Sequence, residues 1–228
     1  MRLKANMINT INILFLLALS MPVFAQNFKS KIRKELFTKN AMVVTAHPLA
    51  SEAGVEILKK GGNSIDAMVA VHFALAVVFP KAGNLGGGGF LVYRDKDGKS
   101  KTLDFREKAP EKAHRNMYLD ENGEIINRLS IDGHLAAGVP GSVAGMFEAH
   151  SKYGKLPWSE LLEPAIQLAE KGFYITYIEA GGLNSNKERF LKFNNHEVPF
   201  VKNGIWKSGN KLVQKDLAET LKRIQKSG

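Results

Sequence analysis

Two helical segments follow one another in the first strongly patterned part of the chain. Pro48 suits the first turn of a helix because its φ is fixed. The apolar residues that follow it, within 50–58, recur at helical spacing. The glycine pair at residues 61–62 is a typical helix end. Asn63, with an acidic residue three positions later, forms a capping box for a second helix, and residues 67–79 are almost entirely apolar. We expect two consecutive helices, the second of them buried in the core.

A β-hairpin is predicted next. Residues 90–94 and 101–105 are strand-like and flank a turn at residues 95–98 that ends in glycine. Antiparallel pairing across this turn brings the start of the first strand beside the end of the second. The glycine run 86–89 and Arg106 should therefore lie at the same edge of the sheet.

The rest of the chain is predicted to contain further helices joined by loops. A glycine-rich stretch over residues 138–145 leads into a helix that reaches about residue 150, and residues 156–172 predict another helix. Residues 181–203 are polar and are expected to form loops, and residues 212–225 form a final amphipathic helix. Residues 41–46, near the start, are β-prone.

The N-terminus has the pattern of a signal peptide. Arg2 and Lys4 form a basic start, residues 11–19 are apolar, and small residues precede an expected cleavage site after Ala25. The apolar run is shorter than the roughly 20 residues of a membrane span, although an uncleaved anchor is the alternative. We expect an exported protein, periplasmic or secreted, with a mature domain over residues 26–228.

Composition and charge narrow the possible functions. The chain has no cysteine, so it has no disulfide, no thiolate metal site and no cysteine nucleophile. Its formal charge is +10, and removal of the signal peptide with its two basic residues lowers this to +8. The lysines are scattered and no nucleic-acid motif is present, so we interpret the charge as a solvated basic surface and expect no nucleic-acid partner.

The four consecutive glycines and the nearby arginine are the candidate chemistry. Gly86, Gly87, Gly88 and Gly89 either pack closely against other backbone or shape a pocket with their N–H groups. Arg106 either pairs with a neighbouring acid such as Glu107 or binds a substrate carboxylate with two hydrogen bonds.

Other kinds of site do not match the sequence. A strand follows the glycines, whereas a phosphate-binding P-loop or a dinucleotide-binding fingerprint needs a helix there. The six histidines have no metal-ligand spacing, so we expect neither a metal nor a cofactor. Ser142 is not in the sequence context of a nucleophile elbow and is interpreted as a helix cap. No candidate nucleophile stands out in the chain.

Several ordered motifs together resemble the γ-glutamyltranspeptidase family. They are TAHPLAS at 45–51, GGNSIDA at 61–67, GNLGGGGF at 83–90, DFREKAP at 104–110, GVPGSVAG at 138–145, YGKLP at 153–157 and QKDLA at 214–218. The resemblance extends from about residue 41 to the end of the chain.

The resemblance implies an α+β fold, the αββα sandwich of the N-terminal-nucleophile hydrolases. It also implies a precursor that cuts itself into a large and a small subunit, the N-terminal threonine of the small subunit being the nucleophile. This threonine would take the γ-glutamyl group from glutathione or another γ-glutamyl compound and pass it to water, an amino acid or a peptide. The small subunit of the same precursor is the implied protein partner.

Matched position by position, the resemblance assigns Arg106 to the α-carboxylate of the γ-glutamyl group. It assigns Glu107 a supporting role and places Gly86, Gly87, Gly88 and Gly89 in the loop beside the pocket. The threonine-led small-subunit motif has no counterpart here, so no catalytic residue is expected in this chain. We expect the chain to be the N-terminal part of the large subunit, an incomplete sandwich that is inactive alone.

Two alternatives stay open. The first is a related acylase of the same fold that acts on β-lactam side chains or polyglutamate. The second is a non-catalytic basic protein that binds the cell envelope.

Overall fold

The structure of the protein is a computed structural model that describes residues 37–227. The predicted signal peptide over residues 1–25 lies outside the described residues. The helices and strands within residues 37–227 belong to one unit that begins at Asn40. None of the helices within 37–227 combines the length and the apolar character needed to cross a membrane.

The two helices predicted first are present as α2 (Pro48–Lys59) and α3 (Ser64–Val78). The imidazole of His47 caps α2 by accepting a hydrogen bond from the backbone N–H of Leu49 at 3.2 Å. At the start of α3, Asn63 forms the predicted capping box with the acid three residues later. Local sequence signals alone thus set where both helices begin.

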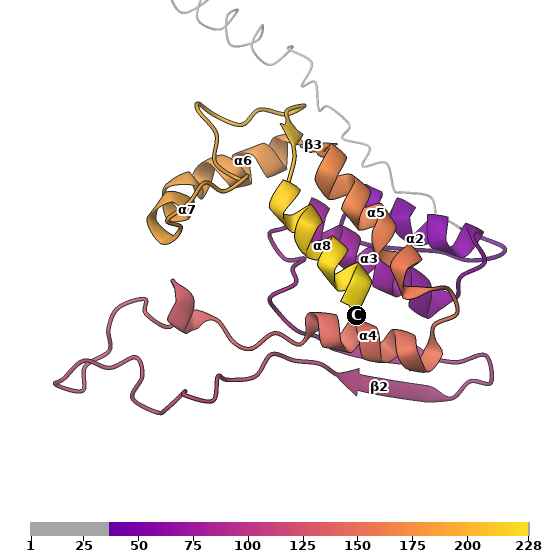
Figure 1. The fold of residues 1–228 in the computed structure, drawn as a ribbon, viewed down its shortest axis with the longest axis horizontal. Helices are drawn as coiled ribbons and strands as arrows, with labels where there is room; N and C mark the ends of the chain where they lie inside the picture. Colours follow the sequence, from indigo (N-terminus) through magenta and orange to yellow (C-terminus); the bar gives the residue numbers. More distant parts are fainter. Residues whose placement is uncertain (1–36, 228) are drawn as a thin grey trace, which may run out of the picture. The chain divides into compact units, whose positions relative to one another are not determined.

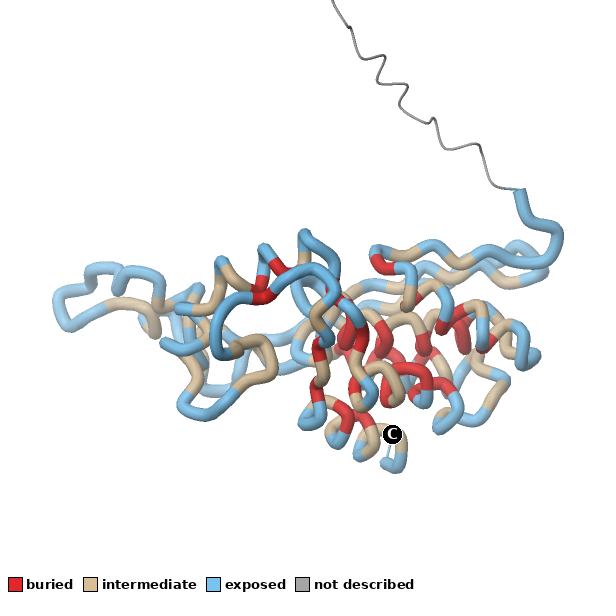
Figure 2. The backbone as a smooth tube through the Cα atoms, turned by 90° about the horizontal axis from the view of Figure 1, so that it is seen from above, coloured by how far each residue is buried: buried red, intermediate tan, exposed pale blue. Residues whose placement is uncertain are grey.

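Helix α3 is the centre of the core. It packs against α2 on one side and against α5 (Trp158–Lys171) on the other, and α5 packs in turn against α8 (Lys215–Ser227). Figure 1 shows these four helices gathered together, and Figure 2 shows that the buried residues concentrate there. The almost continuous apolar sequence of α3 is explained by this position, because a helix covered on several faces has no polar side to keep.

A buried carboxylate ties this core to the next layer. Asp66 is fully buried, and its two oxygens accept backbone N–H groups from Asn63 at 2.9 Å, Lys155 at 2.9 Å and Leu156 at 3.3 Å. The Asn63 amide donates to the carbonyl of Tyr153, the last residue of α4 (Ser142–Tyr153), at 2.6 Å. The capping box of α3 therefore also fixes the α4–α5 connection.

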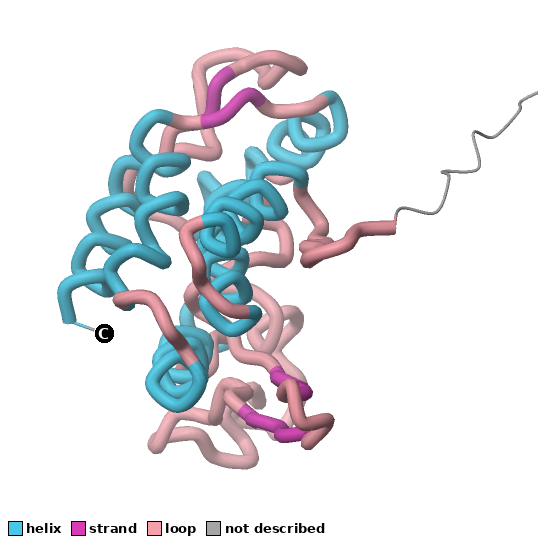
Figure 3. The backbone as a smooth tube through the Cα atoms, turned by 90° about the vertical axis from the view of Figure 1, so that its right-hand side faces the viewer, coloured by secondary structure: helices cyan, strands magenta, loops and turns pink. Residues whose placement is uncertain are grey.

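The hairpin consists of β1 (Phe90–Arg94) and β2 (Ser100–Asp104), which pair antiparallel as predicted. Helix α4 lies between this hairpin and α3 (Figure 1). A second, two-residue ladder joins β3 (Phe173–Tyr174) to β4 (Lys211–Leu212), and the two ladders lie at opposite ends of the helical part (Figure 3). The described residues are α+β, as expected, and they contain two small sheets rather than the two large layers of a complete sandwich.

The prediction of loops over residues 181–203 was wrong in part. Part of the polar stretch 181–203 is helical, in α6 (Tyr177–Ser185) and α7 (Lys187–Phe193). A capping box between Thr176 and Glu179 starts α6, and this signal was overlooked among the polar residues.

The last helix begins at Lys215 rather than at residue 212, because Leu212 pairs with Phe173 in the second ladder. Residues 41–46 form no strand, since none of the described segments pairs with them. A β-prone sequence becomes a strand only where a partner supplies hydrogen bonds.

The buried carboxylate leads to a stability prediction. Asp66→Ala removes the aspartate half of the α3 capping box and leaves three backbone N–H groups without the buried acceptor that they share, so we expect the free energy of unfolding to fall by about 3 kcal/mol. Asp95→Ala is the matched control, because Asp95 also accepts two backbone N–H groups but in an exposed turn. Urea denaturation measures both losses, and equal losses would show that the burial of Asp66 is unimportant.

Candidate carboxylate-binding site

The glycine run and the arginine meet at one edge of the hairpin, as the predicted pairing requires. Gly88 lies directly against the backbone that carries the arginine. A Cβ at this position would come within 2.5 Å of the Glu107 nitrogen and 2.7 Å of the Arg106 Cα. Only glycine lets the two segments approach so closely. Close backbone packing, one of the two interpretations of the run, is therefore what Gly88 provides.

The glycine run is also joined to the start of α4. The carbonyl oxygen of Gly87 accepts backbone N–H groups from Gly141 at 2.9 Å and Ser142 at 3.0 Å. This contact explains why the prediction of Ser142 as a helix cap was wrong. The helix is capped at Gly141, and the Ser142 side chain makes no capping bond because a carbonyl from another segment takes the backbone donors.

Phe105 is wedged between the hairpin and α4. A Cβ on Gly141 would lie 2.0 Å from the Phe105 carbonyl oxygen, and one on Gly145 would lie 2.2 Å from the Phe105 ring. Since successive side chains of an extended segment point to opposite sides, the inward Phe105 turns Arg106 outward. Two hydrogen bonds between Lys108 and Val139, of 3.1 and 2.8 Å, close the junction beyond it.

The Arg106 side chain is charged, accessible and oriented. More than half of it, 56%, is exposed, and it forms an ion pair with Glu107 in which Nη2 lies 3.1 Å from Oε1 and Nε lies 3.4 Å from Oε2. The guanidinium carbon lies 5.6 Å from the centre of the Phe90 ring, within cation–π range. The backbone N–H of Arg106 donates to the Asp104 carboxylate at 3.0 Å.

The pairing keeps both partners ionised. The hydrogen bond from Arg106 lowers the pKa of Glu107, and the same bond raises the pKa of Arg106. Because the folded-state pKa of Glu107 lies below its ordinary value, the pair persists as the pH falls below neutrality and is lost only as Glu107 protonates. The pair uses Nε and Nη2, and among the described residues Nη1 makes no hydrogen bond, so its donors are available to a further acceptor.

A cavity of about 430 Å³ lies beside Arg106. The hairpin end and the start of α4 form its walls, which include Asp104, Phe105, Lys108, Val139 and Glu148. Space of this size next to an oriented guanidinium suits a small anionic molecule. In the part of the chain that the structure describes, no group of three or more His, Cys, Asp or Glu side chains is arranged to hold a metal ion.

The four glycines have different surroundings. Gly86 has nothing within 4 Å of a Cβ position, Gly87 supplies the carbonyl for α4, Gly88 makes the close approach, and Gly89 packs on the Phe105 ring.

Sequence reasoning overlooked Phe90 beneath the guanidinium and Lys108 in the cavity wall. Their positions, directly after the glycine run and two residues after Arg106, were the available signals.

The whole pattern matches a known family. The family model described as gamma-glutamyltranspeptidase matches residues 50–228. The chain belongs to the γ-glutamyltranspeptidase family. A "Glutathione hydrolase proenzyme" of Pseudomonas sp. (strain A14) is 47% identical to it, over 92% of this chain and 37% of the relative. The "Acylase ACY 1 proenzyme" of Pseudomonas sp. (strain SE83) is 38% identical, over 86% of this chain and 36% of the relative.

Solved structures agree with this assignment. The γ-glutamyltranspeptidase of Helicobacter pylori matches with a TM-score of 0.81 and 50% identity, over 84% of this chain and 56% of that chain. The fold is that of the corresponding part of an N-terminal-nucleophile hydrolase. This chain spans a little over one third of the two curated relatives and just over half of the solved chain.

Gly88 and Gly86, in the same run but with different surroundings, give a matched pair of variants. Gly88→Ala forces its Cβ into the backbone of residues 105–107, so we expect a loss of stability of about 2 kcal/mol or more and a displaced Arg106. Gly86→Ala meets open space and should leave stability within about 1 kcal/mol of the parent. Thermal or urea unfolding distinguishes them, and equal stability of the two variants would contradict the close approach.

Proposed function

We propose that the complete protein, of which this chain spans a part, hydrolyses glutathione and transfers γ-glutamyl groups. The observation that carries the proposal is Arg106, held by Glu107 and Phe90 at the edge of a cavity formed by the hairpin end and the start of α4. The names of the similar proteins, glutathione hydrolase and γ-glutamyltranspeptidase, support the same reaction.

In this proposal Arg106 binds the α-carboxylate of the γ-glutamyl group through two hydrogen bonds, and Glu107 orients the guanidinium. Gly88 allows the backbone to come close enough for this placement, and the other glycines of the run shape the loop. Holding the anionic end of the donor fixes where its γ-carbonyl lies, which is a positioning contribution to catalysis.

The bond-making group belongs to another part of the protein. The N-terminal threonine of the small subunit, released from the same precursor, attacks the γ-carbonyl, and the amine leaves with a proton as the amide C–N bond breaks. Water, an amino acid or a peptide amine then takes the γ-glutamyl group from the threonine ester. Residues 1–228 thus supply a wall of the binding site and no catalytic residue.

Arg106 also bears on the alternative that the protein is an acylase. A relative at 38% identity has an acylase name, so the scaffold by itself does not select the substrate. A guanidinium with an accessible edge favours γ-glutamyl and glutaryl donors, both of which end in a carboxylate, over neutral acyl donors, so Arg106 argues only against an acylase of neutral acyl groups. A panel of γ-glutamyl, glutaryl and neutral acyl amides separates the two, and preference for the glutaryl or neutral acyl amides would support the acylase.

Arg106 is the residue to change in the complete protein. We expect Arg106→Ala to raise KM for a γ-glutamyl anilide by about 10- to 100-fold, because charge-assisted hydrogen bonds to the substrate are lost. Arg106→Lys should fall between this variant and the parent, since it keeps the charge but loses the planar two-point contact. Steady-state kinetics with circular dichroism as a folding check measure the effect.

The matched control is Arg94→Ala, at the other end of β1, which should leave KM unchanged. An unchanged KM in Arg106→Ala would exclude the carboxylate role. The chain of residues 1–228 by itself serves as a second control, and turnover of the anilide by it would place a nucleophile within this chain.

Export is part of the proposal. We infer that residues 1–25 direct the precursor out of the cytoplasm and are removed after Ala25. N-terminal sequencing of the large subunit from a cell-envelope fraction should begin at Gln26. A large subunit that retains residues 1–25, or that fractionates with the cytoplasm, would contradict the signal-peptide interpretation.

A further inference from the structure

A second cation lines the cavity that Arg106 lines. Lys108 contributes to the same wall of the 430 Å³ space, together with Asp104 and the start of α4. Nothing in the family resemblance drawn from the sequence gave this lysine a role. Because it lies beside the proposed carboxylate-binding arginine, Lys108 can contact another part of the γ-glutamyl donor.

The backbone holds Lys108 in a defined register with Arg106. Lys108 is bonded in both directions to Val139, and the carbonyl of Lys108 lies 3.0 Å from where a Cβ on Gly138 would be. This bridge keeps the segment extended. In an extended segment, residues two apart share a side, so Arg106 and Lys108 project from the same side with Cα atoms about 6.6 Å apart.

Lys108 also differs from the other charged groups of the cavity wall. Arg106 is paired with Glu107, and the Asp104 carboxylate accepts the backbone N–H of Arg106. Glu148, on α4, is paired with Lys152 at 2.5 Å. Within residues 37–227, the Lys108 ammonium has no carboxylate within ion-pair distance, and the residue is exposed. Among the described residues, Lys108 is therefore the cation of the wall that has no carboxylate partner, as Asp104 is the carboxylate that has no cation partner.

We propose that Lys108 binds a second carboxylate, carried by the leaving group of the donor, and so selects γ-glutamyl peptides that end in a free carboxylate. This inference rests on the proposed function of the site. Glutathione has such a group on its glycine, and because its γ-linkage adds two carbons to a tripeptide backbone of about 10 Å, its two carboxylates lie on the order of 12 Å apart when extended. The Cα atoms of Arg106 and Lys108 are closer together than the two carboxylates of the donor. The flexible four-carbon side chain of Lys108 can extend far enough to make up this difference.

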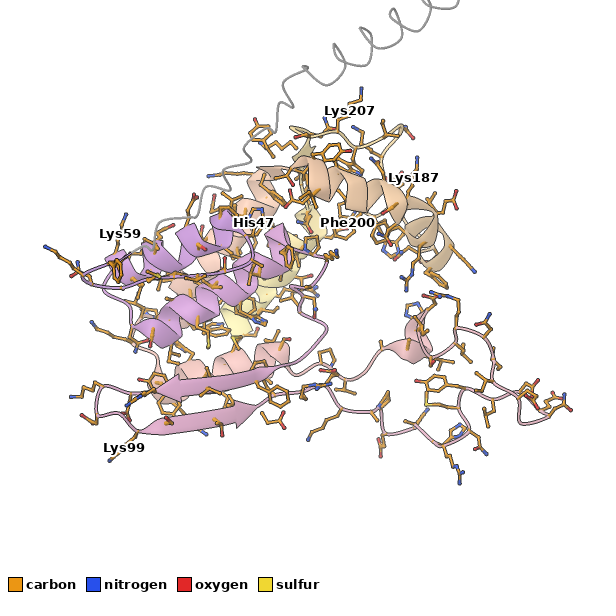
Figure 4. All side chains as sticks on the ribbon, turned by 180° about the vertical axis from the view of Figure 1, so that it is seen from behind. His47, Lys59, Lys99, Lys187, Phe200 and Lys207 are labelled. Carbon is orange, nitrogen blue, oxygen red and sulfur yellow. The ribbon has the colours of Figure 1, made fainter. Side chains whose placement is uncertain are left out.

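The test compares two donors that differ by one charge: glutathione and glutathione amidated on its glycine. We expect the complete protein to prefer glutathione in kcat/KM, and Lys108→Met to reduce this preference by about two- to fivefold, the range for an exposed ion pair. Lys108→Arg should restore the preference, and added salt should weaken it in the parent. Lys99→Met is the matched control, at the turn at the far end of the hairpin (Figure 4).

The outcomes separate this inference from the proposed function. An unchanged donor ratio in Lys108→Met, or an equal fall in Lys99→Met, would overturn the role of Lys108 while leaving the γ-glutamyl reaction intact. Failure of Lys108→Arg to restore the ratio would also overturn it, because a charge at this position would then not be what matters. If the parent protein turns over neither donor, the proposed function itself fails, and the role of Lys108 fails with it.

Discussion

The close approach of glycine backbone to residues 105–107 is the constraint on which the site depends. Gly88 from the loop and Gly141 from the start of α4 each touch this short segment where a Cβ would collide. Between them, the Phe105 ring fills the space against Gly145. Three elements distant in sequence are thereby fixed to one another, and the only direction left for the Arg106 side chain is outward.

This junction rests on the helical core through α4. Asp66 and Asn63 bind the chain at both sides of the α4–α5 connection, so the same residues that start α3 also set where α4 ends. Buried carboxylates are costly unless their oxygens are satisfied, and here three N–H groups satisfy them. The position of the hairpin edge relative to the core is therefore determined by polar contacts as well as by apolar packing.

The two cations at this edge of the hairpin, Arg106 and Lys108, are held in different ways. Arg106 is oriented by a partner that also leaves part of the guanidinium accessible, whereas Lys108 is fixed through its backbone and its ammonium pairs with no carboxylate in the described part of the chain. An oriented planar cation suits a carboxylate that must be placed accurately, and a flexible one suits a group at variable distance. In the proposed site, one short extended segment thus holds the two carboxylates of a γ-glutamyl peptide.

The sequence by itself determined the local elements and their boundaries where the signals are local. The capping box of α3, the proline at the first turn of α2 and the turn of the hairpin each act within a few residues, so the two first helices and the antiparallel pairing of β1 with β2 were predicted. The pairing also placed the glycine run beside Arg106, and the family motifs indicated a carboxylate ligand.

Only the tertiary structure decided which glycine does what and which side chains join Arg106. Gly86 and Gly88 belong to the same run of four glycines, yet one meets open space and the other meets backbone from another segment. The cap of α4, the strand at Leu212 and the unmatched charge of Lys108 likewise depend on partners far away in the chain. Contacts between distant segments depend on how the whole core packs, and no local pattern encodes that packing.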